Sequence, residues 1–385
     1  MKYRKLGKTG LKVSELALGC EYVWHSEEND VVDLVHTAID AGINYIDIFV
    51  GTPTTRDYFG RALKGIRDKV ILAGHLGCID INDQYVRTRD ILLCEDFIQQ
   101  FYTRLQTDYI DILYLHNCDE EDDYNNIFDG AMYQRALELK NEGKVRFLGF
   151  SSHNTKIALK AVRSGKVDVL MFPVNPLFNL MPRDSAIEKM FSLEIDGIMP
   201  EAEKLSYPTK QELYEECIAR EIGIIAMKPF AAGNILKNHE GGVLQGLLSL
   251  TPVQCISYIL DQNKATIALP GFKNVEELNE ALAYFTATDE EKDYQTELKE
   301  SDLYQFKNQC MYCNHCQPCP KKIDVAEVTK LKDMAEKEMT EEIRSRYHAL
   351  EVNASDCLFC GACTKRCPFG IDVSKNMKRA KELFT

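Results

Sequence analysis

The sequence predicts an α/β chain built as a (β/α)₈ TIM barrel and followed by a small, mostly α-helical domain rich in cysteine. Short apolar runs alternate with longer amphipathic stretches from residue 16 to about residue 288, and eight such pairs can be counted. Eight of the 14 cysteines then fall within residues 310–367. We therefore expect a barrel domain over residues 1–295 and a second domain over residues 296–385.

The eight expected strands are short runs rich in Val, Ile and Leu, as is typical of parallel strands that are buried on both faces. They cover residues 15–18, 43–48, 70–73, 109–115, 146–150, 167–172, 222–227 and 265–269. An open doubly wound sheet is the alternative. However, no G-x-G-x-x-G follows the first strand, so the usual dinucleotide-binding loop of that fold is missing.

The stretches between the strands have the spacing of amphipathic helices. Over residues 90–105, apolar side chains recur every three or four residues and form one stripe, with Thr88 as the expected N-cap. The segment KYRKLGKTGLKVSELAL is expected to form a hairpin that caps the bottom of the barrel. An insertion over residues 178–209 has the length of a lid or a subunit contact, with a plain surface loop as the alternative.

Charge and hydropathy argue against several classes of partner. The formal net charge is −13, and residues 301–385 carry 14 Lys and Arg against 12 Asp and Glu, so the negative excess lies on the barrel. An acidic body argues against nucleic acid and against an anionic membrane surface. No apolar run reaches the roughly 18 residues of a membrane span, and the first residues lack the apolar core of a signal peptide. We expect a cytoplasmic protein.

Eight cysteines form two complete sets of ligands for iron–sulfur clusters. The first set, CMYCNHCQPCP, contains Cys310, Cys313, Cys316 and Cys319. The second set, CLFCGACTKRCP, contains Cys357, Cys360, Cys363 and Cys367. In this pattern three cysteines at short intervals hold one [4Fe–4S] cluster, and the cysteine before proline binds the other cluster. We assign cluster one to Cys310, Cys313, Cys316 and Cys367, and cluster two to Cys319, Cys357, Cys360 and Cys363.

Two [4Fe–4S] clusters in one ferredoxin-like domain suit a relay of single electrons, and they would also staple a segment whose own apolar core is thin. Structural zinc is the alternative, but zinc sites come as separated Cys-x-x-Cys pairs rather than continuous runs. The remaining cysteines are scattered, and in a reducing compartment we expect most of them to be buried, unreactive thiols. They are Cys20, Cys78, Cys94, Cys118, Cys217 and Cys255.

Catalytic groups of such barrels lie at the C-terminal ends of the strands. The polar residues at these ends are, in strand order, Asp47, His75, His116, Asn117, Ser151, Ser152, His153, Asn175 and Lys228. The turn PGFKN after the last strand, with Gly271 and Lys273, has the form of a phosphate-binding turn at a helix start. Histidines around one barrel mouth with an aspartate also resemble a metal site of the hydrolase type, which remains an alternative.

The chain resembles the aldo-keto reductase superfamily, in particular its branch with a C-terminal ferredoxin-like domain. The resemblance covers nearly the whole chain. It rests on YRKLGKTGLKVSELALG, AGINYIDI, RDKVILA, TDYIDILYLH, GKVRFLGFSSHN, GIIAMKPFAAG, ALPGFKNVEELNEAL, the glycine of YFGRALKG and the cysteine sets. It implies NAD(P)H-dependent carbonyl reduction, in which a tyrosine gives the proton with help from a lysine, a histidine and an aspartate.

Only half of this catalytic set is carried over. The aspartate falls on Asp47 and the histidine on His116, whereas Thr52 stands at the tyrosine position and His75 at the lysine position. A threonine hydroxyl is too weak an acid to replace the tyrosine, and loss of a positioned acid costs about 10²–10⁴ in rate. We therefore expect Asp47, His75 and His116 to be the catalytic residues, with one imidazolium as the acid.

The resemblance also implies a nicotinamide site formed by Ser151, Ser152, Lys228, Gly271 and Lys273. Several positions depart from the family pattern: Met171 replaces a glutamine, Ser152 replaces an asparagine, and Glu277 stands where NADP-preferring members carry a basic residue. NAD(P)H and flavin therefore both stay open as barrel cofactors, beside the two [4Fe–4S] clusters.

Hydride transfer moves two electrons, whereas a [4Fe–4S] cluster moves one, so a flavin or a substrate that accepts single electrons must lie between them. We predict an oxidoreductase whose clusters relay electrons to or from a small-molecule site at the barrel mouth. The alternatives are an NAD(P)H-dependent carbonyl reductase that uses His75 and His116 and keeps its clusters for structure, and a catalytically degenerate iron–sulfur scaffold. A small-molecule substrate and a redox partner protein are the expected partners.

Overall fold

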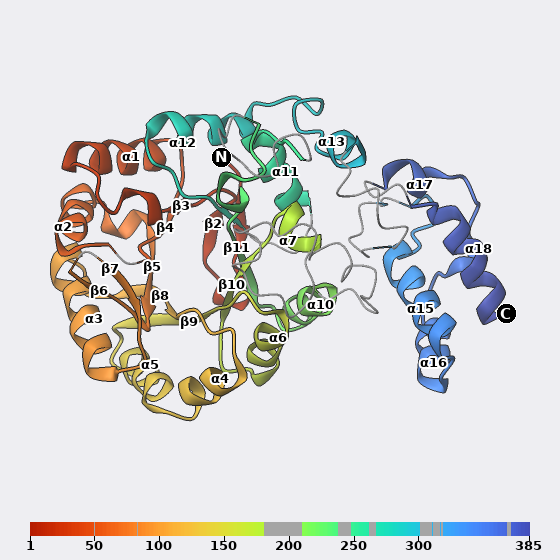
Figure 1. Ribbon diagram of the computed structural model, residues 1–385, viewed down its shortest axis with the longest axis horizontal. Helices are drawn as coiled ribbons and strands as arrows, with labels where there is room; N and C mark the ends of the chain where they lie inside the picture. The colour runs from red at the N-terminus through yellow and green to blue at the C-terminus, as the bar shows by residue number, and fades with distance from the viewer. Residues whose placement is uncertain are drawn as a thin grey trace.

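The computed structural model describes residues 1–49, 51–82, 84–180, 210–237, 248–261, 267–300, 310, 316, 319–367 and 371–385. Figure 1 shows two parts, a ring of strands and helices and a smaller group of helices near the C-terminus. The predicted fold class is confirmed. Most of the insertion at residues 178–209 lies outside the described residues, so its role stays a prediction.

Eight parallel strands form one sheet in the order β12-β11-β10-β9-β8-β5-β4-β3. Their bounds are β3 Leu18–Gly19, β4 Tyr45–Asp47, β5 Ile71–Leu76, β8 Ile110–Leu115, β9 Val145–Ser151, β10 Val169–Pro173, β11 Gly223–Met227 and β12 Ile267–Leu269. Parallel bridges from Leu16 to Ala268 and from Gly19 to Gly271 join the two edges and close the sheet into a barrel. Each predicted strand overlaps one of these eight.

Helices surround the strands in Figure 1, as the sequence pattern predicts. Their bounds are α1 Glu28–Asp40, α2 Pro53–Ala62, α3 Ile91–Leu105, α4 Glu121–Phe128, α5 Ala131–Asn141, α6 Thr155–Ser164, α7 Pro176–Leu180, α10 Gln211–Ala219, α11 Pro252–Asp261, α12 Val275–Leu282 and α13 Gln295–Glu300. The predicted apolar stripe of α3 is buried against the barrel.

The predicted N-cap of α3 is wrong. The carboxylate of Asp90, rather than the hydroxyl of Thr88, accepts hydrogen bonds from the first N–H groups of the helix, those of Leu92 and Leu93. Thr88 instead accepts a hydrogen bond from the N–H of Asp90. Both residues are good caps, and the one directly before the first helical residue takes the role.

The predicted N-terminal hairpin is confirmed. β1 (Tyr3–Lys5) pairs with β2 (Lys12–Ser14) in antiparallel register. The turn between them meets the loop before β11, where the N–H of Lys8 donates to the carbonyl of Glu221 at 2.5 Å. Gly7 has φ +49°, and a Cβ at this position would lie 2.2 Å from the Glu221 carbonyl oxygen. The hairpin therefore covers the N-terminal end of the barrel and needs glycine where the two backbones touch.

The barrel interior is packed with side chains. One buried cluster fills it, with Leu6, Val13, Ala17, Tyr45, Ile71, Ala73, Ile112, Tyr114, Val169, Met171, Ile225, Met227, Ile267 and Leu269. The hydroxyls of Tyr45 and Tyr114 lie 2.8 Å apart in the middle of this cluster. Because a buried polar group is costly unless it is paired, the two tyrosines satisfy each other.

A second hairpin, not predicted from the sequence, lies between β5 and α3. It consists of β6 (Cys78–Ile81) and β7 (Gln84–Arg87), with Asp80 opposite Tyr85 in the register. The turn passes through Asn82, which has a positive φ of 53°. The turn sequence ND lacks the glycine that marks most two-residue hairpins, so the local pattern gives a weak signal.

The C-terminal part consists of helices, with bounds α15 Val325–Lys337, α16 Glu341–His348, α17 Ala362–Arg366 and α18 Val373–Phe384. The rings of Tyr347 and Phe384 stack with their centroids 3.9 Å apart. Lys330 of α15, whose side chain is buried, pairs with Glu215 of α10 at 3.2 Å and so links this part to the barrel. The predicted domain boundary at residue 295 stays a prediction. Within the described ranges, no helix has both the length and the apolar character needed to span a membrane.

Candidate active site

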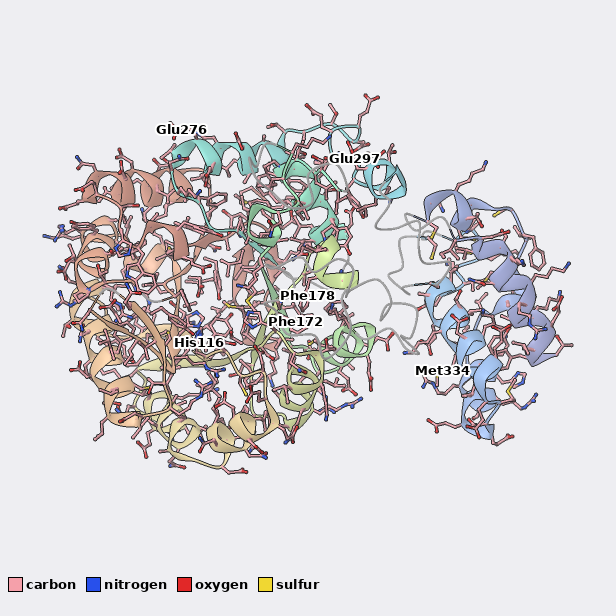
Figure 2. All side chains as sticks on the ribbon, viewed as in Figure 1. His116, Phe172, Phe178, Glu276, Glu297 and Met334 are labelled. Carbon is pink, nitrogen blue, oxygen red and sulfur yellow. The ribbon has the colours of Figure 1, made fainter. Side chains whose placement is uncertain are left out.

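A cavity of about 700 Å³ opens at the C-terminal ends of the barrel strands. Of the residues predicted for the site, it brings together Asp47, His75, His116, Ser151, Lys228, Gly271 and Lys273. Figure 2 marks His116 inside the barrel, well away from Met334 in the C-terminal part. Seven of the eight barrel residues predicted for the site, all except Ser152, therefore line one cavity.

Three of these residues form a line of hydrogen bonds. Asp47 Oδ1 lies 2.9 Å from His75 Nε2, and His75 Nδ1 lies 3.0 Å from His116 Nδ1. All three are buried, with 5%, 3% and 5% of their surface exposed. Because a carboxylate only accepts, His75 Nε2 carries a hydrogen, and the two facing Nδ1 atoms share one hydrogen between them. The line can thus carry a proton between a buried carboxylate and the cavity.

The strand order places these residues side by side. Asp47 ends β4, His75 lies in β5 and His116 follows β8, and these three strands are neighbours in the sheet. The ring of Tyr114 stacks on His75 with centroids 5.1 Å apart. Gly149 makes room for that ring, since a Cβ there would lie 2.3 Å from Tyr114 Cδ1. His75 is therefore held in place by packing as well as by its hydrogen bonds.

His116 is neutral near pH 7. Burial lowers its pKa well below the ordinary histidine value, and the positive charges of His75, Arg89, His153 and Lys228 lower it further. A neutral imidazole has one donor and one acceptor nitrogen, so it can pass a proton along without holding a charge. Within the line, His116 can therefore accept a proton at one ring nitrogen and donate a proton from the other.

Tyr85 extends the line to the cavity surface and is not among the residues predicted from the sequence. Its hydroxyl lies 3.0 Å from His116 Nε2, and its ring packs on Phe49 with centroids 5.3 Å apart. The residue reaches this position from β7 of the unpredicted hairpin. The strand-forming residues of CIDI and QYVR, which are Ile79, Ile81, Tyr85 and Val86, are a local signal that could have found it.

Thr52 serves the fold at the position where the resembled family has its tyrosine. Its Oγ1 accepts a hydrogen bond from the N–H of Thr55 at 3.1 Å and caps α2. Tyr58 lies in α2, packs against the core and stands under the guanidinium of Arg61, 5.0 Å from the ring centroid. Neither side chain is among the described residues that line the cavity.

Ser152 and His153 organise the loop after β9. The Ser152 hydroxyl donates to Asp119 at 3.0 Å, and His153 Nδ1 lies 2.9 Å from the other oxygen of the same carboxylate. Burial alone would raise the pKa of Asp119, but the hydrogen bonds from His153 and Ser152 outweigh it and lower the pKa. Ser152, predicted as a cofactor ligand, is absent from the cavity wall as the described residues form it.

The phosphate-type turn before α12 is filled by the protein's own side chain. Asn274 caps the helix by accepting from the N–H of Glu277 at 2.9 Å. The carboxylate of Glu277 then turns back and accepts from the N–H of Lys273 at 2.8 Å. A phosphate that bound here would have to displace this carboxylate, because both need the same backbone donor.

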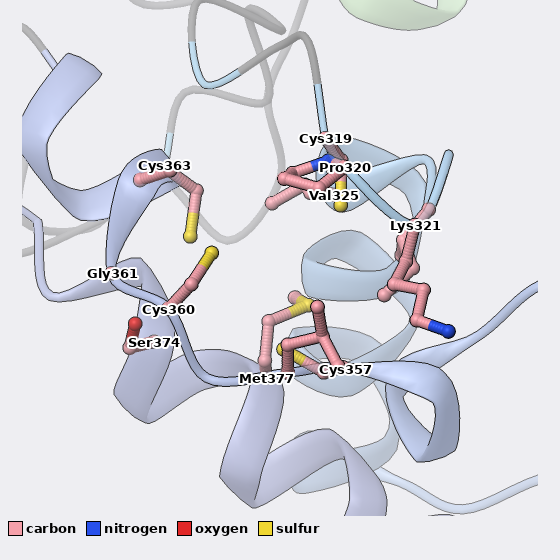
Figure 3. A pocket seen from close by; sticks show the side chains of 13 residues that line it. Cys319, Pro320, Lys321, Val325, Cys357, Cys360, Gly361, Cys363, Ser374 and Met377 are labelled. Atoms are coloured by element: carbon pink, nitrogen blue, oxygen red, sulfur yellow. The ribbon is translucent and has the colours of Figure 1, made fainter.

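The four cysteines assigned to cluster two line one small cavity in the C-terminal part. Cys319, Cys357, Cys360 and Cys363 form its wall. Figure 3 shows the sulfur atoms of Cys360 and Cys363 facing each other, with Cys319 and Cys357 on neighbouring segments. Burial raises the pKa of Cys357, and the negative charges of the other three thiolates act in the same direction. The residues present therefore fit a group that binds all four sulfurs.

Four thiol side chains around one cavity suit a [4Fe–4S] cluster, because each iron of a cubane takes one thiolate ligand. The N–H of Phe359 also donates to Cys357 Sγ at 3.4 Å, a contact that cluster sulfurs commonly receive.

The cysteines of cluster one are described in part. Cys316 and Cys367 are buried and Cys310 is partly buried, while Cys313 lies outside the described residues. The six scattered cysteines are buried, as predicted. Burial raises the pKa of Cys94 to about 11 and that of Cys118 to about 12, so these thiols stay protonated.

A closed (β/α)₈ barrel with an acid–base cavity at its mouth and a cysteine-rich tail defines an oxidoreductase with an iron–sulfur domain. Residues 16–243 match the Aldo/keto reductase family, and residues 350–371 match the 4Fe-4S binding domain. The chain belongs to the aldo/keto reductase family.

Known relatives agree with this assignment. The chain is 24% identical to the aldo-keto reductase YhdN of Bacillus subtilis over 78% of this chain and 94% of that protein. It is 29% identical to the oxidoreductase YqkF of B. subtilis over 48% of this chain and 59% of that protein. It is 30% identical to L-galactose dehydrogenase of Arabidopsis thaliana over 44% of this chain and 56% of that protein. The last two matches thus span little more than half of those relatives.

Solved structures share the fold. Aldo-keto reductase AKR11C1 of Bacillus halodurans superposes with a TM-score of 0.56 at 21% identity, over 76% of this chain and 95% of that chain. An aldo-keto reductase structure from Pseudomonas aeruginosa gives a TM-score of 0.53 at 22% identity, over 74% and 95%. At these identities the likeness supports the barrel architecture alone.

Proposed function

We propose that this chain is an iron–sulfur oxidoreductase that acts on a small molecule in the barrel cavity, with Asp47, His75 and His116 as its proton-handling residues. One observation carries the proposal: the unbroken line of hydrogen bonds from the Asp47 carboxylate to His116 at the cavity wall. Reduction at an oxygen-bearing group consumes protons together with electrons. A buried acid–base line that ends at a cavity is suited to supply them.

His75 is the proton store in this proposal. Its Nε2–H donates to the Asp47 carboxylate at 2.9 Å, and a proton on its Nδ1 faces His116. His116 receives the proton at Nδ1 and releases one from Nε2. Lys228 and Lys273 line the cavity together with Glu277 and Glu280, so the wall carries charges of both signs, and an anionic group on the substrate would bind at a lysine and away from these carboxylates.

The two cysteine sets fit two [4Fe–4S] clusters, which supply or accept electrons one at a time when bound. We assign cluster one to Cys310, Cys313, Cys316 and Cys367, and cluster two to Cys319, Cys357, Cys360 and Cys363. The cavity shared by the second set supports the assignment of cluster two. Glu277 in the phosphate-type turn supports an electron source other than a dinucleotide.

The second candidate function is NAD(P)H-dependent carbonyl reduction with clusters that serve only the structure. Membership of the aldo/keto reductase family favours it. In that case Ser151, Lys228, Gly271 and Lys273 would bind the nicotinamide cofactor, which supplies hydride. Flavin is the third option for the same cavity, because it exchanges both one and two electrons.

We also propose a redox partner protein that exchanges electrons with the clusters. Leu358 and Phe359 lie between Cys357 and Cys360, and they are 60% and 43% exposed. Exposed apolar side chains next to cluster ligands suit brief docking of an electron-transfer protein, whose contacts are small.

Anaerobic purification with chemical analysis tests the proposal. We expect about eight iron and eight sulfide per chain and no bound nicotinamide. We also expect added menadione to reoxidise the reduced clusters of the protein. Trp24 is the sole tryptophan and lines the cavity, so its fluorescence reports on nucleotide binding. Quenching by NADPH together with NADPH-driven turnover would favour the second candidate instead.

His116→Ala separates cavity chemistry from a scaffold role. It interrupts the hydrogen-bonded line, so we expect turnover to fall about 10²–10⁴-fold. His348→Ala is the matched control, because His348 is exposed on α16 in the C-terminal part. Unchanged turnover in the His116 variant would contradict the proposed role of the cavity.

A further inference from the structure

Tyr85 presents the outer end of the hydrogen-bonded line to the cavity. It is 37% exposed, whereas Asp47, His75 and His116 are each at most 5% exposed. Its hydroxyl is also within hydrogen-bond distance of His116 Nε2, at 3.0 Å. Among these four cavity-lining residues, Tyr85 is the most exposed, so its side chain is the one that a bound molecule can approach most easily.

The hairpin holds Tyr85 in a defined place. The N–H of Thr88 donates to the carbonyl of Gly77 at 3.0 Å and closes the base of the hairpin. Arg89 ties that base to the barrel, because it pairs with Asp123 at 2.6 Å and donates to the Asn117 carbonyl at 3.0 Å. The ring of Phe49 also packs on the Tyr85 ring. Such support keeps the hydroxyl at His116.

The environment of Tyr85 suits a group that gives up a proton and regains it. Burial raises the pKa of Tyr85, so the hydroxyl is protonated near pH 7. A hydrogen bond from the Asn117 side chain and the charges of Arg87 and Arg89 act in the opposite direction, because they favour the phenolate. The proton is thus present before the reaction, and the hydrogen bond from Asn117 and the two arginine charges offset part of the cost of forming the buried anion.

We propose that Tyr85 is the residue that hands the proton to the substrate, at the end of a relay through His116 and His75. The proposal rests on the proposed function, whose iron–sulfur carriers, or a reduced nicotinamide in the second candidate, supply the electrons. The O–H bond of Tyr85 breaks as an O–H bond forms on a carbonyl or quinone oxygen that gains negative charge.

The relay restores the phenol in the same cycle. The phenolate takes the hydrogen of His116 Nε2, His116 Nδ1 takes the hydrogen of His75 Nδ1, and His75 is left neutral with its Nε2 hydrogen on Asp47. One proton leaves the site per cycle. A proton from solvent returns through the hydroxyl of Tyr85 to His116 Nε2, and the hydrogen between the two Nδ1 atoms moves back to His75. A quinone that takes two electrons gains two protons in two cycles, and with hydride as the reductant a carbonyl needs only one.

Tyr85→Phe tests this role, because it removes the hydroxyl and keeps the ring that packs on Phe49. The matched control is Tyr133→Phe, whose hydroxyl donates to the Lys166 carbonyl at the outside of the barrel. Anaerobic holoprotein is given menadione or 4-nitrobenzaldehyde as probe, with photoreduced clusters or NADPH as the reductant. We expect Tyr85→Phe to lower the wild-type rate about 10²–10⁴-fold and to change its pH profile, and Tyr133→Phe to do neither.

A substrate-free measurement judges Tyr85 even if no probe is turned over. Tyrosine labelled with ¹³C at Cζ gives one resonance that disappears in Tyr85→Phe. We expect that resonance to have a different position in His75→Gln than in the wild type, because the line of hydrogen bonds connects Tyr85 to His75 through His116. A role in packing alone would leave it unmoved.

The two experiments separate two kinds of failure. Wild-type protein that reduces neither probe with either reductant contradicts the proposed function, and the resonance of Tyr85 then decides the relay by itself. Equal rates for the two phenylalanine variants, or a Tyr85 resonance that does not respond to His75→Gln, would overturn the assignment of Tyr85.

Discussion

Replacing His116 by glutamine should make the stability of the protein less sensitive to acid. An unfolded histidine binds a proton below about pH 6.5, whereas burial and nearby positive charges lower the pKa of native His116 well below that value. Below pH 6.5 the unfolded chain therefore binds a proton that the native chain does not. The free energy of unfolding falls as the pH decreases, until the lowered native pKa is reached.

The size of this effect follows from the unfolded pKa alone while His116 stays neutral. Between pH 7 and pH 5 the wild type loses about 2 kcal/mol through this one group. His116→Gln removes the group from both states, so it should lose about 2 kcal/mol less than the wild type over the same range.

Urea unfolding of anaerobic holoprotein measures the difference, with the fluorescence of Trp24 as the signal from the barrel. Wild type, His116→Gln and His348→Gln are compared at pH 7 and pH 5. His348 is exposed, so its variant should lose as much stability as the wild type. If wild type and His116→Gln lose the same free energy of unfolding to within about 0.5 kcal/mol, then native His116 takes up a proton in this pH range, and the inference that it stays neutral is refuted.

Three further predictions concern the cofactor sites and the fold. Glu277→Arg removes the carboxylate from the phosphate-type turn and reverses its charge, so NADPH should bind about 10-fold tighter or more, as measured by tryptophan quenching. Glu276→Arg on the exposed side is the control, and equal NADPH affinities for the two variants would show that the turn does not bind the cofactor. Cys360→Ser should lower iron and sulfide per chain by about half, while the buried Cys217→Ser keeps both; full iron in the first variant would contradict the assigned set. Thr52→Ala should cost about 0.5–2 kcal/mol of stability through the lost helix cap, with turnover unchanged; a large loss of turnover would place that hydroxyl in the reaction.

Local patterns made much of the architecture predictable. Strands buried on both faces appear as apolar runs and the helices as stripes, and both signals depend on neighbours a few residues apart. The positions of Asp47, His75 and His116 followed from the same reasoning. The C-terminal ends of parallel strands meet at one face of a barrel, so polar residues at those ends meet there.

Contacts between distant segments were not predictable in this way. Tyr85 is 31 residues from His116 in the chain, and it meets His116 because a hairpin with a weak turn signal folds over the cavity. The carboxylate of Glu277 was correctly placed near the phosphate-type turn, but its bond to the N–H of Lys273 depends on a side-chain conformation. Pattern gives the position of a residue, whereas the direction of its side chain is set by the surrounding packing.

The two imidazole rings that face each other through Nδ1 limit how many protons the site can hold at one time. Two nitrogens 3.0 Å apart have room for a single hydrogen between them, so the pair cannot be doubly charged at one moment. A reaction that consumes two protons at this site must therefore take up a proton from water between the two proton transfers. Exchange with bulk solvent is then a required step of each such turnover.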